Sequence, residues 1–486
     1  MFRDALLKLF DRTKIEDGPE SLGQFSEDIS FVQPCTPTLV ISPENKEEVK
    51  AIVRLANNYH TPLVPVSSGP PRFRGDTIPE HGGVIVDLSK MNRILKIDSK
   101  HRYIMVEPGV TYAQLVPELR KKGMRLNMPF LPRGSKSVVT SYLEREPKII
   151  PKYQYDDMDP LLTLEVVYGT GDDFRTGSAS GPGTLESLKS DKVNPWGPGS
   201  IDYFRFLSGA QGTMGLVTWA TIKTEVLPSF QKMYFIPAGD VDSLTQAMNM
   251  LLRKRVVDEC LALNNVNLAT VLSETWPGDF EELKENLPPW TLIVCLAGYQ
   301  RFPEERVRVM EKYLSEICEG LGLKPQTKLP GTEIKGNTIL ELLSNPWDKK
   351  TYWKLRHKNA CHDIFFLTTL SRVPEMIQSL KKIVLNCGYS YSDIGGYIQP
   401  TVQGRGCHCE FSLSCDHSNS EETASVRKLF MDASRALMNE GGFFSRPYGP
   451  WAEMVYSRKD EGVTALNKLK DIFDPNHILN PGKLCF

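Results

Sequence analysis

The sequence predicts an α+β protein of two or three domains, and three observations carry this prediction. Short β-branched runs alternate with helical patterns over residues 36–127, which is typical of a small mixed unit. After Pro228 the helical segments become longer and apolar strands lie between them, so we place a domain boundary near 228. The chain has 486 residues, 41% hydrophobic and 24% charged, which suffices for at least one large core.

The first segment reads as strand, helix, strand and loop. Residues 36–42 (TPTLVIS) predict a short strand, and a helix follows with Ser42 as its N-cap and Pro43 at its first position. Residues 61–66 (TPLVPV) predict a second strand, which enters a glycine- and proline-rich loop over 67–83.

Two turn-rich stretches follow in this segment. Residues 159–177 hold an apolar run, a GTGDD turn and a polar return, which predicts a hairpin. In residues 208–228 (SGAQGTMGLVTWATIKTEVLP), glycines recur at every third position before a β-branched run. A glycine-rich turn that runs into a strand indicates that the backbone comes close to another group.

The second segment, residues 229–440, carries the longer helical patterns. Met248 and Met250 lie two apart on one of them, so we assign them to the core or the helix surface and not to a cofactor site. The chain then ends in a helix closed by Asp474 and Pro475, followed by a turn-rich tail.

Charge and cysteine usage narrow the function classes. The 58 basic and 59 acidic residues give a net charge of −1, which offers no support for a nucleic-acid partner. We expect neither a secretory signal in the charged first 20 residues nor an apolar run of the roughly 18–20 residues that span a bilayer. The ten cysteines follow no CxxC…CxxC pattern, so we expect free thiols in a reducing cytoplasm and no iron–sulfur cluster in the chain itself.

The common phosphate-binding motifs GxGxxG and GxxxxGK[ST] do not occur, so a nucleotide would need another architecture. The loop over 65–79 (PVSSGPPRFRGDTIP) offers one. The small residues at 67–69 let backbone N–H groups converge on an anion, and Arg74-Gly75-Asp76 adds a charge and a second close approach. Taken alone, this loop fits an ordinary surface turn better.

Taken together, the segments form an ordered series that resembles a known family. The series is TPLVPV, the glycine loop, GGVIVDLSKMNRI, YIMVEPGVTYAQL, LLTLEVVYGTGDDFRTG, LSGAQGTMGLVTWATIKTEVLP and the tail LKDIFDPNHILNPGKL. It resembles the FAD-binding oxidoreductases of the vanillyl-alcohol oxidase and p-cresol methylhydroxylase superfamily, which includes glycolate oxidase and D-lactate dehydrogenase flavin subunits. The resemblance is strong over 36–228 and 466–484 and weak across 229–440.

The resemblance implies a p-cresol methylhydroxylase-type FAD-binding domain of two subdomains over 1–228. It further implies an α+β cap over 229–440 that supplies the substrate pocket, and a segment over 441–486 that returns to the first domain. The implied FAD contacts are the first loop (Ser67, Ser68, Gly69, Arg74, Gly75, Asp76), the second loop (Ser135, Ser137, Thr140, Ser141), the glycine turn (Gly209, Gly212, Gly215, Val217) and the tail (Asn480).

The resemblance also bears on how FAD is held. It puts the three glycines of the turn where a side chain would collide with the cofactor, and the tail near the isoalloxazine. The loop over 65–79 has no His or Cys for the covalent flavin link found there in relatives, so we expect non-covalent FAD. A link from a Tyr or His of the cap is the alternative.

Catalysis at a flavin needs a group that takes the substrate hydroxyl proton and a cation that balances developing negative charge. Arg446 in FFSRPYG resembles the arginine that relatives carry before their C-terminal helix. Tyr397 and Tyr448 are candidates for hydrogen bonds to substrate, although a Tyr beside an apolar run is more often a packing residue.

His408 and Glu410 are the candidate proton acceptors, because strand alternation in GRGCHCEFSLSC puts both on one face. The same alternation puts Cys407, Cys409 and Phe411 on the other face. Metal ligation and ordinary packing are the alternatives for the pair. The metal pattern HxGDGNxH of the 2-hydroxy-acid relatives is absent, so we expect no metal there.

The resulting hypothesis is an FAD-dependent oxidoreductase that oxidises a C–H bond next to a hydroxyl by hydride transfer to flavin N5. Its small-molecule substrate is an aryl alcohol or phenol, or a 2-hydroxy acid. One alternative is a flavin subunit that passes electrons to a separate iron–sulfur or electron-transfer flavoprotein partner. The other is a non-catalytic homologue that has lost FAD. A homo-oligomer is compatible with either.

Overall fold

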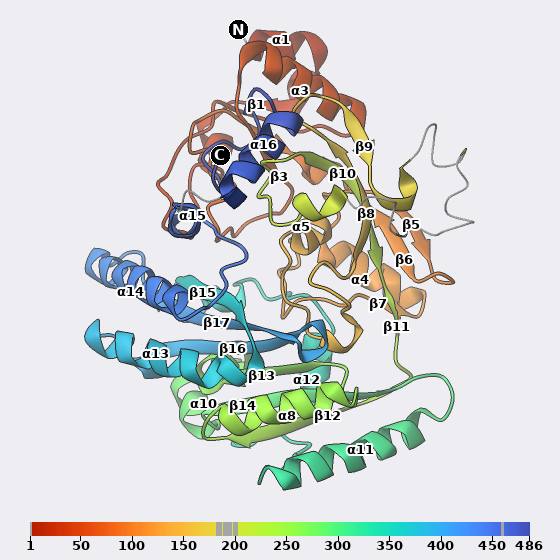
Figure 1. The fold of residues 1–486 in the computed structure, drawn as a ribbon, viewed down its shortest axis with the longest axis vertical. Helices are drawn as coiled ribbons and strands as arrows, with labels where there is room; N and C mark the ends of the chain where they lie inside the picture. Colours follow the sequence, from red (N-terminus) through yellow and green to blue (C-terminus); the bar gives the residue numbers. More distant parts are fainter. Residues whose placement is uncertain (1, 181–186, 188–196, 198–202, 458–460) are drawn as a thin grey trace.

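The computed structural model describes residues 2–180, 187, 197, 203–457 and 461–486. Within these residues the chain mixes helices with three sheets of four or more strands, and the predicted α+β class is confirmed. Figure 1 shows the two smaller sheets in one half of the molecule and the largest sheet in the other. No helix in the described ranges is long and apolar enough to cross a bilayer.

The first sheet has the order β1-β2-β4-β3, and β2, β4 and β3 run parallel. Its strands and helices are β1 (Ile15–Glu16), β2 (Leu39–Ile41), β3 (Leu63–Val66), β4 (Val84–Asp87), α1 (Phe2–Leu9), α2 (Pro19–Gly23) and α3 (Lys46–Tyr59). The predicted N-cap at Ser42 is wrong. Asn45 caps α3, because its side-chain oxygen accepts the N–H of Glu48 at 3.0 Å.

The second sheet is antiparallel, in the order β5-β6-β10-β8-β9. It and its neighbours comprise β5 (Ile94–Asp98), β6 (Tyr103–Val106), α4 (Tyr112–Lys121), β7 (Met124–Arg125), α5 (Val138–Leu143), β8 (Leu161–Val167), β9 (Asp173–Arg175), β10 (Leu216–Lys223) and β11 (Glu225–Val226). The hairpin predicted over 159–177 is confirmed as the β8–β9 pair, in register at Glu165 and Arg175. The glycine turn at 208–215 leads directly into β10.

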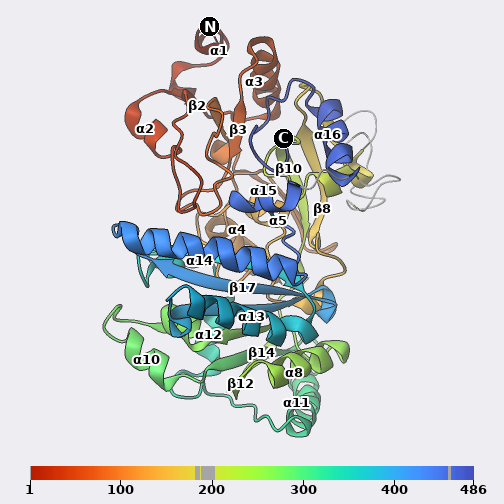
Figure 2. The same ribbon diagram turned by 60° about the vertical axis from the view of Figure 1, so that its left-hand side comes forward.

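The third sheet is antiparallel, in the order β12-β14-β13-β16-β17-β15. Its elements are β12 (Phe230–Ala238), α8 (Asp242–Arg253), β13 (Cys260–Asn264), α9 (Asn265–Leu272), α10 (Phe280–Asn286), β14 (Trp290–Gly298), α11 (Pro303–Gly320), α12 (Gly336–Leu343), β15 (Ala360–Thr368), α13 (Val373–Asn386), β16 (Ile394–Thr401), β17 (Gly406–Cys415) and α14 (Ser420–Asn439). Helices α13 and α14 run side by side along it (Figure 2).

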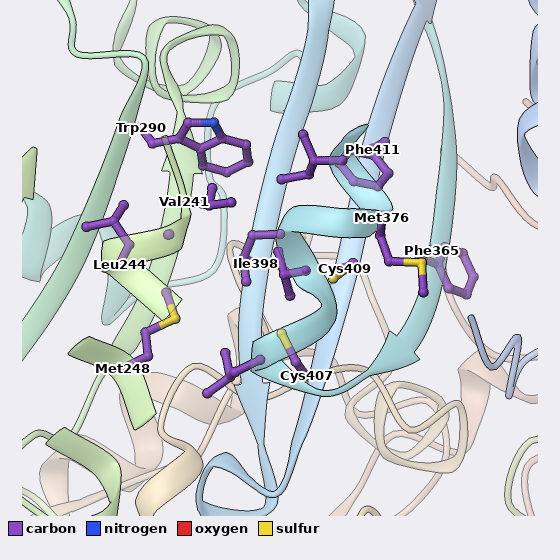
Figure 3. Packing of buried hydrophobic residues seen from close by; sticks show 14 of the residues in the cluster. Val241, Leu244, Met248, Trp290, Phe365, Met376, Ile398, Cys407, Cys409 and Phe411 are labelled. Atoms are coloured by element: carbon purple, nitrogen blue, oxygen red, sulfur yellow. The ribbon is translucent and has the colours of Figure 1, made fainter. Parts of the chain in front are cut away.

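The largest apolar core lies between this sheet and α8, α11, α13 and α14. Cys407, Cys409 and Phe411 of β17 lie in that core, as the strand alternation predicts, together with Met248 and residues of α13 (Figure 3). Met248 is fully buried and Met250 is 40% exposed, which confirms their assignment to core and helix surface. The other side chains of β17, including Glu410, therefore face away from these helices.

The C-terminal segment returns to the first sheet through α15 (Pro450–Tyr456) and α16 (Glu461–Phe473). The N–H of Leu63 in β3 donates to Ile478 at 2.7 Å, and the N–H of Asn480 donates back to Leu63 at 2.8 Å. The predicted divisions at 228 and 440 stay predictions. The first falls between β11 and β12, which pair in different sheets.

A buried ion pair holds this returning tail. The Lys470 ammonium donates to Asp474 at 2.5 Å, to the carbonyl of Thr213 at 2.6 Å and to that of Leu479 at 3.0 Å. Asp474 in turn accepts the N–H groups of Ile478 and Leu479. Lys470 and Asp474 are at most 1% exposed. If either residue lost its partner, water could not replace the missing hydrogen bond.

Lys470→Met is therefore expected to lower the free energy of unfolding by about 3–5 kcal/mol, because it leaves the Asp474 carboxylate buried without its cation. Urea denaturation measures the change. Lys468→Met, on the same helix at an exposed position, is the control and should shift stability by no more than about 0.5 kcal/mol. Equal effects of the two substitutions would contradict this role of the pair.

Candidate active site

Two adjoining cavities lie in the part of the molecule formed by the first two sheets, and the first cavity also reaches the third sheet. The first, of about 140 Å³, reaches from the loop at 65–77 to strands β15, β16 and β17 and to Arg446. The second, of about 110 Å³, lies among α5, the glycine turn and the start of β10. Ser67, Asp76 and Thr140 line both, so the two cavities form one continuous site.

The two loops predicted to hold a cofactor are bonded directly to each other. The hydroxyls of Ser67 and Thr140 lie 2.5 Å apart, and Ser68 Oγ accepts the N–H of Ser137 at 3.1 Å. The N–H of Gly69 donates to the carbonyl of Ser135 at 3.1 Å. Ser67, Ser68, Arg74, Asp76 and Thr140 line the cavities.

The other residues of these loops that were predicted to contact a cofactor do not line either cavity. Several of them form hydrogen bonds to other parts of the protein. Ser137 is the N-cap of α5, and its hydroxyl donates to the carbonyl of Pro108. Ser141 donates to Glu146 at 2.6 Å, and the N–H of Gly75 donates to Asp28 at 2.7 Å. Neither cavity is lined by Gly69, Gly75, Ser135, Ser137 or Ser141. Their contacts to a cofactor stay predictions.

The glycine turn lines the second cavity, and Val217 lies beside it at the start of β10. The structure adds a reason for these glycines that involves the protein alone, and the expected collision with a cofactor stays a prediction. Gly209 and Gly212 have φ of +75° and +74°, and a Cβ there would lie 2.5 Å from Arg145 and 2.4 Å from Pro65. A Cβ at Gly215 would lie 2.4 Å from Val166. Close approach of the chain to itself therefore requires these glycines.

Asn480 lines neither cavity but joins three segments beside them. Its amide nitrogen donates to the carbonyl of Asp76 at 2.9 Å and to that of Gln211 at 2.6 Å, while its backbone pairs with Leu63. Asn480 is 1% exposed, and its Oδ1 has no hydrogen-bond partner in the described part of the chain. The tail thus fixes the first loop relative to the glycine turn.

Glu410 lies in a chain of charged groups at the cap side of the first cavity. Lys354 donates to Glu410 and to Asp363, at 2.5 Å each. His408 Nε2 lies 3.2 Å from the second oxygen of Glu410, and Ser412 donates to Asp363 at 2.8 Å. Glu410 lines the first cavity, whereas His408 faces a separate hollow of about 50 Å³ behind it.

The charges of this chain follow from burial and pairing. Burial alone would raise the pKa of Glu410, but Lys354 and His408 outweigh it and hold that pKa well below its usual range. Burial lowers the pKa of His408, and Glu410 offsets this only in part. Against burial, Asp363 and Glu410 hold the pKa of Lys354 above its usual value. At neutral pH Glu410 is therefore a carboxylate, Lys354 is an ammonium and His408 is a neutral imidazole.

Arg446 is a buried cation at the same cavity. It is 4% exposed, and its guanidinium lies 4.2 Å from the centre of the Phe365 ring. Burial and the neighbouring Arg74 lower its pKa. Among the described residues, no carboxylate oxygen lies within 4.0 Å of it. Arg446 therefore presents positive charge that the protein does not neutralise by direct contact.

The first domain positions Arg446 through the residues on both sides of it. Arg145 donates to the carbonyl of Ser445 at 2.6 Å, and Gln211 of the glycine turn donates to that of Pro447 at 3.1 Å. The missing Cβ at Gly209 leaves the space in which Arg145 lies. The glycine turn therefore helps to fix the position of Arg446, through Gln211 and through the space that Gly209 leaves for Arg145.

Aromatic side chains form much of the first cavity's wall. Tyr397 lines it and donates to Gln399 at 3.0 Å, and Tyr448 lines the second cavity with Arg74 5.7 Å from its ring centre. The further aromatic lining residues are Phe73, Phe130, Tyr352 and Trp353.

The sequence reasoning missed Lys354, Asp363 and Arg133, which also line the first cavity. Lys354 and Asp363 lie more than 40 residues before Glu410, and only the antiparallel pairing of β15 with β17 brings Asp363 to it. The aspartate directly before the apolar run IFFL, residues 364–367, was the one available signal for Asp363.

The fold combines two sheets, a capping sheet and a polar cavity between them, and comparison with known proteins identifies the class of protein as a flavoprotein oxidoreductase. The profile described as "FAD binding domain" matches residues 37–140, and "FAD linked oxidases, C-terminal domain" matches residues 227–484. The second covers more than half of the chain. The chain belongs to the FAD-linked oxidase family.

Named relatives and solved structures extend over nearly the whole length. The chain is 25% identical to glycolate oxidase subunit GlcD of Bacillus subtilis, over 99% of this chain and 96% of that protein. It is 23% identical to the 4-cresol dehydrogenase [hydroxylating] flavoprotein subunit of Pseudomonas putida, over 92% and 87%. The fold matches p-cresol methylhydroxylase with a TM-score of 0.84 at 19% identity, covering 100% of this chain and 97% of the other. The predicted two-part FAD oxidase fold is confirmed.

The residues present fit FAD. The second cavity combines apolar walls at Leu88, Val139 and Leu216 with hydroxyls and the backbone of the glycine turn, a set suited to a nucleotide. Asn480 leaves a buried amide oxygen free at the junction of the loops. The uncompensated Arg446 suits the charge that a flavin gains on reduction.

Asp76→Asn is expected to stabilise the fold at alkaline pH. Burial, then the carboxylates of Glu144 and Asp28, raises the pKa of Asp76 from 3.8 to about 7. The unfolded chain therefore loses this proton first, and stability falls as the pH rises from about 4 through about 7. Removing the carboxyl should raise Tm near pH 8.5, by about 1–5 °C, and leave it unchanged near pH 4.

Thermal unfolding of samples with matched FAD content measures the difference. Glu27→Gln, an exposed carboxylate of the first domain, serves as the control and should show no such pH dependence. A gain in Tm for Asp76→Asn that is equally large near pH 4 would refute the assignment.

Proposed function

We propose that the chain oxidises an aryl alcohol or phenol at a C–H bond by hydride transfer to N5 of FAD, with a 2-hydroxy acid as the alternative substrate class. The observation that carries this choice is the aromatic wall of the first cavity, which faces Arg446 and Glu410. Flat aromatic substrates pack favourably against such walls. The relatives named for 4-cresol and for glycolate represent the two classes.

Bound FAD supplies N5 as the hydride acceptor, and the protein supplies the charges. Glu410 accepts the hydrogen bond of the substrate hydroxyl at the cavity surface. Glu410 takes that proton, and the neutral His408 holds the second oxygen of the carboxylate, because a 3.2 Å contact between Nε2 and an ionised carboxylate requires Nε2 to donate its own proton. Lys354 keeps the carboxylate ionised and oriented. Arg446 stabilises negative charge on the substrate oxygen or on the reduced cofactor.

The visible spectrum of the purified protein, followed anaerobically against a panel of aryl alcohols, phenols and 2-hydroxy acids, tests this function. Yellow absorbance that one class bleaches supports the proposal and chooses between the classes. A flavin band that no member bleaches would overturn it. A protein that stays colourless after incubation with FAD would favour the homologue that has lost its cofactor.

A second candidate is a flavin subunit within a larger assembly. Two relatives favour it, because one is named as a subunit of glycolate oxidase and the other as a flavoprotein subunit. The same half-reaction would then run here, and the electrons would leave to an iron–sulfur or electron-transfer flavoprotein partner. Rapid flavin reduction by substrate, with reoxidation only after a co-purified partner is added, would support this arrangement. Its cytoplasmic location stays a prediction.

Arg446→Met is expected to lower the rate of flavin reduction about 100- to 1,000-fold, because one preorganised charge at the reacting atoms is lost. Bound FAD should be retained, since the cofactor contacts proposed here lie mainly in the other cavity. Stopped-flow absorbance measures the rate. Arg405→Met, at an exposed position of the cap, is the control and should reduce at the wild-type rate. A wild-type rate for Arg446→Met would remove Arg446 from the mechanism.

A further inference from the structure

A second cluster of polar side chains lies at one end of the cap sheet, away from His408. His362 comes from β15, Cys415 is the last residue of β17, and His417 follows in the next turn. One nitrogen or sulfur atom from each lies within 4.8 Å of the others. The two Nε2 atoms of the histidines are 2.9 Å apart. None of the three residues lines either cavity of the candidate active site.

We propose that these three residues bind one Zn²⁺ ion, with a water molecule as the fourth ligand. Two imidazole nitrogens and one thiolate are a preferred set for zinc and a poor one for Mg²⁺ or Ca²⁺. Ligand bonds of about 2.0–2.3 Å in a tetrahedral site put the donor atoms about 3.3–3.8 Å apart. The present separations need only small side-chain movements to reach this geometry.

The binding step balances without any redox change. Two Zn–N bonds and one Zn–S bond form, and the proton of the Cys415 thiol passes to solvent. At present one ring must donate its Nε2 proton to the other across the 2.9 Å contact. That proton moves to Nδ1 of the same ring, so that both Nε2 lone pairs are free for the metal.

The surrounding residues hold the donors in place. The ring of His362 stacks on Phe31, with the centroids 3.8 Å apart and the planes at 11°. Asn359 accepts the backbone N–H of His417 at 3.2 Å and donates to Asp416 at 2.9 Å, which fixes the turn that carries His417. His362 and Cys415 are buried, while His417 is exposed and gives an ion access from solvent.

The ion would act on the structure and not on the substrate. It would connect the adjacent strands β15 and β17 at the end where Phe31 of the first domain packs against them. Asp363, the residue after His362, holds Lys354 at the candidate active site. Sequence spacing alone did not indicate the site, because His362 lies 53 residues before Cys415.

Zinc binding to the full-length flavoprotein tests the proposal. After dialysis against a chelator, the protein is titrated with Zn²⁺ in competition with a chromophoric zinc chelator, and bound zinc is counted by elemental analysis after gel filtration. We expect one zinc per chain. Cys415→Ser and His417→Ala should each weaken binding about 100-fold or more. His477→Ala and Cys485→Ser, away from the cluster, should not change it.

Cobalt gives a second readout that does not depend on activity. Co²⁺ in the site should absorb at wavelengths longer than those of the flavin, and Cys415→Ser should change this band while the flavin spectrum stays the same. Zinc binding that survives both Cys415→Ser and His417→Ala would overturn the proposal. So would the loss of zinc in His408→Ala alone, which would move the metal to the flavin site, or a failure to bind zinc at all.

Discussion

The candidate site depends on one buried ion pair, between Lys470 and Asp474. The Lys470 ammonium donates to Asp474 at the end of the last helix, to Leu479 in the tail and to the carbonyl of Thr213 in the glycine turn. Asp474 also accepts the N–H of Ile478, so the pair holds the tail beside β3. From that position Asn480 bonds both the first loop and the turn. Two parts of the chain that are more than 250 residues apart are therefore fixed to each other beside the two cavities, and buried charge makes this arrangement specific.

The same part of the structure positions the chemistry. Gln211 and Arg145 hold the carbonyls on either side of Arg446, so that a cation from the C-terminal segment faces the cap strands. On the cap strands Glu410 supplies a negative charge, which the hydrogen bond from Lys354 maintains. A fixed cation and a fixed carboxylate that line one cavity can balance charge as a hydride and a proton leave the substrate.

The secondary structure and the faces of single strands could be predicted from the sequence. Contacts between residues far apart in the sequence could not. The strands, the hairpin and the alternation that separates Glu410 from Cys409 follow from periodicity. The glycines of the turn were recognised as close contacts, but their partners, Arg145 and Pro65, depend on tertiary packing. Lys354 and Asp363 lie far from Glu410 in the sequence, and His362 lies far from Cys415 and His417, so no short motif marks either cluster. The pairing of β15 with β17 brings Asp363 and His362 to these partners.

The most direct test of the account is anaerobic flavin reduction by an aromatic substrate that carries deuterium at the reacting carbon. Transfer of that hydrogen to FAD predicts that the yellow absorbance disappears more slowly with the deuterated substrate, because the C–D bond has the lower zero-point energy. The expected factor in rate is about 2–7, which corresponds to a difference in barrier of about 0.4–1.2 kcal/mol. Reduction at the same rate with both isotopes would show that a step other than cleavage of the C–H bond limits flavin reduction. No reduction by any hydroxylated substrate would contradict the central claim.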